Sequence, residues 1–422
     1  MERYFFREGE VVFENYGRRD WGKFSFPVWY GIPVRVKWAG FLFDFNLRGS
    51  LKRITGSIPH WPDPREIVKR TDGNELIYYS IEGYDTAFDL FKSYYLPINR
   101  KTANLFVKEN PLSGPYLKKA LNAFEDFTSQ AARVTDKEVP ERLRDFLRKV
   151  ALKGQYGLSQ EAYKLKSILG TSIPVLPPDT IDVDYEVIPL ILSEGCTMNC
   201  GFCQFKTKGS FKRRSWSDIV LQMEKLRDFY NGDLVNYQAL FAGQNDALLA
   251  GGDLLIDAAM KAYECFEFAH SFFEGKAKLY FFGDAISFLR APESFFYKLA
   301  TLPYEIFLNI GLESPCRKTL ISLRKPLDDA TVKKAFHKMC WINGELANIC
   351  VTANFVIGDA LLPSHKERIK ELLAEGEVSH GKGVIYLSPL SGASSKRNVL
   401  RDLREIKLVS KIPVYLYLAQ SL

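Results

Sequence analysis

The pattern of apolar and polar residues changes character within the first 184 residues. Over residues 11–81, aromatic and β-branched residues stand in short groups that glycine and proline turn signals separate, which is typical of strands. Over residues 115–169, apolar residues recur at helical spacing. We therefore predict an N-terminal α+β domain over 1–184, β-rich over 1–111 and helical over 112–172.

A different pattern follows a proline-marked stretch at 174–184, which predicts an extended connection between domains. Beyond it, compact apolar runs alternate with helical segments, and repeated βα units predict a parallel sheet. We assign residues 185–422 to this second domain. The expected strands cover residues 187–192, 235–242, 279–282, 306–312, 349–357 and 384–387, and the expected helices include 217–229, 328–339 and 364–373.

Composition favours a folded protein of ordinary globular type. The chain has 422 residues, of which 46% are hydrophobic and 25% charged, which argues against disordered and collagen-like classes. The best membrane-span candidate, 240–260, is interrupted by polar residues, and the N-terminal residues lack the apolar core of a signal peptide. We therefore expect a cytoplasmic protein with no membrane partner. The net charge of +7 is only weak support for a nucleic-acid partner, and so is the basic run at 206–214.

The sequence that carries chemistry directly follows the first expected strand of the second domain. Cys196, Cys200 and Cys203 stand in a C-x3-C-x2-C pattern inside eight residues that also hold a glycine. Three thiolates on such a loop can each take one iron of a cubane cluster and leave the fourth iron open for a ligand. Loops at the carboxyl ends of parallel strands are where α/β folds place their sites.

Structural zinc is the main alternative interpretation of the triplet. A closed zinc site needs four ligands, and the nearest further Cys or His in the sequence is Cys265, in an expected helix. The five histidines form no metal-ligand spacing. The remaining cysteines are expected to pack in the interior, although Cys316 could donate a hydrogen atom at the active site.

The triplet, with an aromatic residue before its last cysteine, resembles the signature of radical S-adenosylmethionine (radical SAM) enzymes, and the resemblance covers residues 186–390. Later family landmarks are Gly243 to Asp246 after the second strand, Asp284 at the end of the third and Ile357-Gly358 after the fifth. Gly311-Leu312-Glu313-Ser314 after the fourth strand, followed by Leu320 and Lys325, is similar to the subgroup of oxygen-independent coproporphyrinogen oxidases, Elongator-type enzymes and methylthiotransferases.

This resemblance implies a partial (βα)6 barrel and a 4Fe–4S cluster on Cys196, Cys200 and Cys203, whose open iron binds S-adenosylmethionine (SAM). It implies reductive cleavage of SAM to a 5′-deoxyadenosyl radical, which abstracts hydrogen from an unknown substrate, and sensitivity to oxygen. A reducing partner such as ferredoxin or flavodoxin is expected. The resemblance implies SAM contacts from Phe202, Gly243, Asp246, Glu313, Ser314 and Ile357.

Two other functions remain open at this point. The protein could be a radical SAM enzyme that modifies RNA or transfers a methyl group, which RNA binding by the 206–214 run would indicate. It could instead be a non-catalytic iron–sulfur or zinc sensor, which would unfold on chelation and leave SAM intact. The role of the N-terminal domain as a lid or substrate platform is an expectation of the radical mechanism, because a reactive radical needs a closed pocket.

Overall fold

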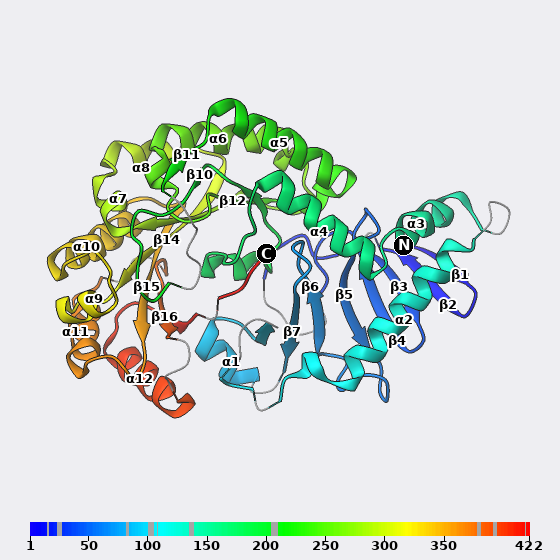
Figure 1. Cartoon of the computed structure of the whole chain (residues 1–422), viewed down its shortest axis with the longest axis horizontal. Coiled ribbons are helices and arrows are strands. Elements are labelled where there is room, and N and C mark those ends of the chain that lie inside the picture. Colours follow the sequence, from blue (N-terminus) through cyan, green and yellow to red (C-terminus); the bar gives the residue numbers. More distant parts are fainter. Residues whose placement is uncertain are drawn as a thin grey trace.

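A computed structural model of the chain contains two large sheets (Figure 1). It describes residues 1–14, 17–22, 28–81, 84–99, 105–107, 109–134, 139–203, 210–377, 381–390, 395–417 and 419–422. The blue N-terminal sheet and the green-to-orange second sheet lie at opposite sides of the view, and the C-terminus lies between them. Within the described residues, no helix is both long and apolar enough to cross a bilayer.

The first sheet has eight antiparallel strands, each paired with its neighbours in sequence. The strand β3 (Val34–Trp38) alternates as one covered face requires: Val34, Val36 and Trp38 are buried whereas Lys37 is exposed. Phe124 and Phe127 of α2 (Pro115–Ala132) pack in the same core as these buried side chains. The other elements are β1 (Glu2–Phe6), β2 (Gly9–Phe13), β4 (Phe41–Phe45), β5 (Leu51–Gly56), β6 (Ile67–Arg70), β7 (Leu76–Ser80), α1 (Tyr84–Phe91), β8 (Leu96–Asn99), α3 (Glu141–Ala151) and α4 (Gln155–Leu169).

The second sheet has seven strands in the order β9-β12-β13-β14-β15-β16-β17, and every neighbouring pair is parallel. Right-handed crossovers between strands in sequential order place their helices on one side, and Figure 1 shows these helices along the outer side of the sheet. The prediction of an α/β fold with a parallel sheet is confirmed. The strands are β9 (Ile188–Leu190), β12 (Ala239–Ala242), β13 (Ala277–Asp284), β14 (Tyr304–Glu313), β15 (Ile349–Ile357), β16 (Ile385–Pro389) and β17 (Val414–Leu416).

The helices of this half follow the strands in turn. They are α5 (Trp216–Tyr230), α6 (Gly252–Cys265), α7 (Ala285–Arg290), α8 (Glu293–Ala300), α9 (Arg317–Ser322), α10 (Asp329–Glu345), α11 (Pro363–Ala374) and α12 (Lys396–Val409). A short antiparallel pair, β10 (Ser193–Glu194) with β11 (Lys212–Arg213), stands apart from the main sheet.

Buried charges and a shared core join the two halves. Lys69 on β6 is 1% exposed, and its Nζ lies 3.4 Å from Asp184 Oδ2 and 3.1 Å from Glu186 Oε1. The core of the parallel sheet also includes Phe91 and Leu165 from the first half. The division at residue 184 therefore stays a prediction.

Two local expectations are corrected. The stretch 174–184 is not extended throughout, because residues Pro178–Val183 form a 3-10 helix that buries Asp179. The strand expected from residue 235 begins at Ala239, because Asn231–Asn236 also form a 3-10 helix. Such short turns carry no periodic signal of their own.

Candidate functional site

The cysteine triplet lies on a loop at the carboxyl end of β9. The loop leaves β10 at Glu194 and returns on β11, so the β10–β11 pair closes its base. Gly195 has φ +81°, and a Cβ there would lie 2.6 Å from the Ser210 carbonyl oxygen, so the base of the loop requires glycine. Asn245, beyond β12, donates from Nδ2 to the Gly195 carbonyl oxygen at 3.0 Å. Residues 204–209, with most of the basic run, lie outside the described residues.

The three thiols are neighbours with different exposure. Cys200 is buried, whereas Cys196 and Cys203 are partly exposed. The pKa of the Cys200 thiol is raised to about 11, chiefly by burial; Lys325 lowers it, and Glu313, Cys196 and Cys203 add to the rise. In the part of the chain that the structure describes, no three Cys, His, Asp or Glu side chains converge as ligands of one metal ion. A cubane cluster takes one thiolate on each of three irons, so three separated thiols on one loop suit it chemically.

A strained carboxylate stands beside this loop at the end of β14. Glu313 has φ +63°, and the register of β14 against β15 shifts between Gly311 and Glu313, which leaves Leu312 without a partner in the ladder. Glu313 Oε1 lies 3.6 Å from the buried Nζ of Lys325. A Cβ on Gly311 would lie 2.7 Å from Glu313 Oε1 and 3.2 Å from Lys325 Nζ, so a larger residue there would displace this ion pair. Burial raises the pKa of Glu313, and Lys325 partly offsets this rise.

Ser314, the next residue, has its hydroxyl engaged within the protein. Its Oγ is 2.8 Å from Nδ1 of His365, and the Nε2 of His365 is 2.7 Å from the Val356 carbonyl oxygen. Because that carbonyl can only accept, Nε2 carries the proton and Ser314 donates to Nδ1. Ser314 Oγ also accepts from the Cys316 N–H at 3.0 Å, so the serine fixes the turn that leaves the strand. The Cys316 Sγ lies 3.6 Å from Ser364 Oγ, and its role as hydrogen donor stays a prediction.

Two further carboxyl groups meet at the ends of β12 and β13. Burial first, and the neighbouring Asp284 carboxyl group second, raise the pKa of Asp246 to about 8. Asp246 is therefore mainly protonated at neutral pH. Asp246 Oδ1 accepts from the Leu248 and Leu249 N–H groups, and Asp284 Oδ1 accepts from the Ile286 and Ser287 N–H groups at the start of α7. Each carboxyl group thus orders one loop, and Asp246 Oδ2 is buried without a hydrogen-bond partner in the described part of the chain.

A cavity of about 710 Å³ opens beside the cysteine loop and the Asp284 carboxyl group. Thr197 and Met198 of the cysteine loop form one wall, and Asp284 and residues of α7 and α8 form others. The lining residues are Thr197, Met198, Leu248, Leu249, Gly252, Asp253, Asp284, Ile286, Ser287, Arg290, Ala291, Pro292, Ser294, Phe295, Lys298 and Pro326. Its volume is ample for a ligand the size of a nucleoside.

The remaining predicted contacts lie at the carboxyl ends of neighbouring strands. Gly243 has φ +91° and donates from its N–H to the Leu190 carbonyl oxygen at 2.7 Å, next to the start of the cysteine loop. Phe202 is half-buried between Gly201 and Cys203. Ile357 ends β15 and is buried. The structure thus places Glu313 and Gly243 beside the cysteine loop; that these residues contact SAM stays a prediction.

The sequence did not reveal the roles of Asp284 and Lys325 in the candidate site. The resemblance groups Lys325 with the fourth-strand landmarks but does not indicate its ion pair with Glu313, and it assigns Asp284 no function. Asp284 ends an apolar strand, a position that marks a site in parallel sheets, so the sequence offered a signal for it.

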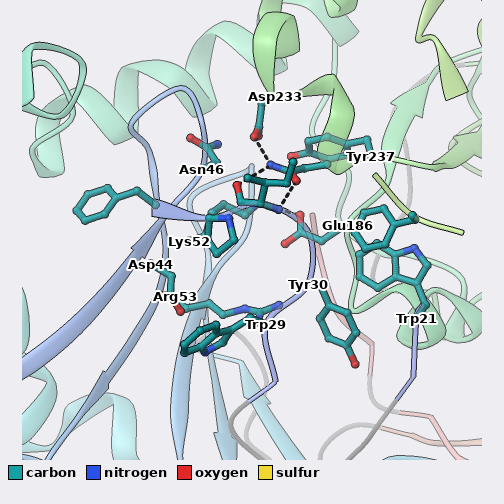
Figure 2. Close-up of a pocket in the computed structure, with 15 residues that line it drawn as sticks. Trp21, Trp29, Tyr30, Asp44, Asn46, Lys52, Arg53, Glu186, Asp233 and Tyr237 are labelled. Carbon is teal, nitrogen blue, oxygen red and sulfur yellow. Dashed lines mark hydrogen bonds and ion pairs between the residues drawn. The ribbon is translucent and has the colours of Figure 1, made fainter. Parts of the chain in front are cut away.

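A second pocket lies at the other end of the sheet. It has a volume of about 50 Å³ and lies against residues that precede β9, β12 and β13, among them Glu186, Asp233 and Phe273. Figure 2 shows aromatic rings around charged side chains, and Lys52 Nζ lies 2.9 Å from Glu186 Oε2. The cysteine loop leaves the carboxyl end of β9, so this pocket is separate from the candidate site.

No protein-family model matches this chain, and no curated protein matches its sequence. Among solved structures, the cobalamin-dependent S-adenosylmethionine radical enzyme OxsB aligns at 14% identity and a TM-score of 0.35, over 57% of this chain and 34% of OxsB. HydG, a maturase of the FeFe hydrogenase, aligns at 14% identity and a TM-score of 0.37, over 69% of this chain and 60% of HydG. Methylornithine synthase (PylB) aligns at 11% identity and a TM-score of 0.34, over 70% of this chain and 81% of PylB.

The match thus spans about a third of the length of OxsB. At TM-scores this low, these likenesses do not by themselves establish a fold or an activity for this chain.

Proposed function

We propose that this chain is a radical SAM enzyme. When bound, a 4Fe–4S cluster supplies the electron that cleaves SAM to methionine and a 5′-deoxyadenosyl radical, and that radical removes a hydrogen atom from the substrate. The observation that carries the proposal is the loop of three cysteines at the carboxyl end of the first parallel strand, beside the buried Glu313–Lys325 pair and a 710 Å³ cavity.

Cys196, Cys200 and Cys203 would hold the cluster. Thiolates are the form that binds iron, and burial alone keeps Cys200 protonated. The Lys325 ammonium lowers the pKa of the Cys200 thiol, so it favours the thiolate form. Lys325 is in turn held by Glu313, which fixes its position without exposing it to solvent.

Asp246 and Asp284 would receive the amino group of SAM. In the resembled family an acidic element after the second strand contacts this group, and here Asp246 occupies that part of the chain. An ammonium group bound beside Asp246 would favour the charged carboxylate, so binding would lower the pKa of Asp246 and release its proton. Asp284 lines the cavity, and Asp246 lies next to Asp284 outside the cavity lining.

We further propose that the parallel sheet is the partial barrel of this family. Its sequential strand order and the helices on its outer side support this arrangement. The N-terminal half would then cover or bind the substrate. The buried Lys69 ion pairs and the shared core would hold the two halves in a fixed relation.

The test is anaerobic reconstitution with iron and sulfide, reduction with dithionite, and detection of 5′-deoxyadenosine from added SAM by mass spectrometry. We expect the product from the intact chain, and none from a Cys200→Ala variant that folds normally. Cys265→Ala is the matched control, because Cys265 ends α6 far along the chain from the loop, and it should keep full activity. A full cluster that leaves SAM intact would refute the proposal and favour the sensor alternative.

A further inference from the structure

A group of exposed cations surrounds the outer side of the cysteine loop. We infer that the surface formed by Arg317, Lys318, Ile321 and Arg324, here called the α9 surface, docks a small acidic protein that carries a low-potential one-electron centre. The inference rests on the proposed function, because only a chain that cleaves SAM reductively needs an electron at every cleavage.

The α9 surface is tied directly to the cysteine loop. The N–H of Gly201, which follows Cys200, donates to the Leu323 carbonyl oxygen at 2.8 Å. A Cβ on Gly201 would meet that oxygen at 3.1 Å and the Arg324 side chain at 3.2 Å, so the two segments are in close contact. Electron transfer slows steeply with distance, which makes this the favoured side for entry.

The cations of this surface are largely unpaired among the residues that the structure describes. Residues 317–325 contain four cations and no acidic residue, and only Lys325 is buried. Among the described residues, Arg317, Lys318 and Arg324 form no ion pair within 4 Å, although the charge of Arg317 does act on Asp328. Across the cavity, Arg290 and Lys298 are also exposed cations without an ion pair in the described part of the chain. Such a field steers an acidic partner toward the loop.

The centre of the α9 surface is apolar. Ile321 is 67% exposed between the cationic residues, an arrangement of apolar centre and charged rim that suits a protein interface. Residues 317–326 contain no Phe, Tyr or Trp. Single-stranded nucleic acids are usually held by aromatic rings that stack on their bases. The surface therefore favours an acidic protein over RNA.

The electron balance of the proposed step is simple. The reduced carrier loses one electron, and that electron breaks one carbon–sulfur bond of SAM. Dithionite supplies the same electron without docking. Comparison of the two reductants therefore separates docking from chemistry.

The experiment compares 5′-deoxyadenosine formation driven by reduced bacterial flavodoxin or ferredoxin with formation driven by dithionite. The test variant is Arg317→Glu/Lys318→Glu, in which both positions are exposed and carboxylates at the start of a helix are tolerated. The matched control is Lys118→Glu/Lys119→Glu on α2, which Figure 1 places at the other side of the molecule from α9. We expect the carrier-driven rate of the test variant to fall by about tenfold or more, with dithionite-driven rates unchanged.

Added salt should lower the carrier-driven rate of the unmodified chain and leave the dithionite-driven rate unaffected. An unchanged carrier-driven rate in the test variant, or an equal loss in the α2 control, overturns the inference. If dithionite yields no product from the intact chain, the proposed function fails; calorimetric titration of the full chain with flavodoxin and ferredoxin then decides docking by itself. If the Arg317→Glu/Lys318→Glu variant loses RNA binding but keeps carrier binding, the surface belongs to nucleic acid and the inference is overturned.

Discussion

Gly311 and Glu313 show how a single missing side chain shapes the candidate site. The bulge turns Glu313 into the left-handed region, and its carboxylate occupies the space that a Cβ on Gly311 would fill. A backbone strain of this kind persists only where the surroundings hold it, here through the ion pair with Lys325.

Gly311→Ala should therefore push Glu313 away from Lys325. We expect a loss of about 1–3 kcal/mol in the free energy of unfolding, measured by urea denaturation, together with loss of SAM cleavage. Gly232→Ala is the control, because a Cβ there meets no atom within 4 Å. Equal stability of the two variants would contradict this account of Gly311.

Asp246 predicts a pH dependence of stability. Its pKa of about 8 in the folded chain lies above the ordinary value of an aspartate, so the folded state binds a proton that the unfolded state has already lost. The contribution of Asp246 to the free energy of unfolding is fully present at low pH and is lost as the pH rises from about 4 to about 8. The pKa of Asp246 is raised first by burial and second by the Asp284 carboxyl group.

Asp246→Asn should remove this dependence, because the amide stays neutral and can donate to Asp284. We expect the thermal unfolding midpoint of the variant to exceed that of the unmodified chain at pH 8, and the difference to shrink toward pH 5. Asp253→Asn, an exposed position in the same cavity, should show no such trend. A variant whose midpoint tracks that of the unmodified chain at every pH would contradict the raised pKa of Asp246.

At the scale of elements, capping residues set where the helices around the site begin. Asp328 accepts from the Thr331 N–H at 2.7 Å and starts α10, which packs against β14 and β15. Asp328→Ala should cost about 1 kcal/mol of unfolding free energy by chemical denaturation. The adjacent Asp329→Ala lies inside the helix and makes no such cap, so its cost should be smaller; the reverse order would contradict the assignment of the cap.

The sequence pattern predicts elements well where apolar runs are long. The expected strands at 306–312 and 349–357 fall within or on β14 and β15, because continuous apolar runs mark strands that helices cover on one side and a core fills on the other. It fails at short or unpatterned elements: the expected strand list omits β17, which has three residues. The cysteine loop can be located from spacing, whereas the meeting of Asp246 with Asp284 cannot, because it depends on how two strands are aligned.

At the scale of the whole molecule, buried charges hold the two sheets together. Lys69→Met would leave Asp184 and Glu186 with one cation fewer in a buried setting, and removal of one partner from such a group costs about 3–5 kcal/mol. We expect a lower midpoint in calorimetry with the two halves still unfolding together. Lys118→Met, on the exposed side of α2, should leave the midpoint unchanged. A Lys69→Met variant as stable as the unmodified chain would show that these ion pairs do not join the halves.

The sequential strand order also bears on how the chain folds as it leaves the ribosome. Each strand of the parallel sheet pairs with the one made just before it, so the sheet can grow one unit at a time without waiting for distant segments. The last residues behave differently, because Leu176 donates its N–H to the Gln420 carbonyl oxygen and Leu422 donates to Ile173. Those two bonds close a loop of more than two hundred residues. These two bonds can therefore form only after the cysteine loop has been made, whereas the ion pairs of Lys69 use residues made before that loop.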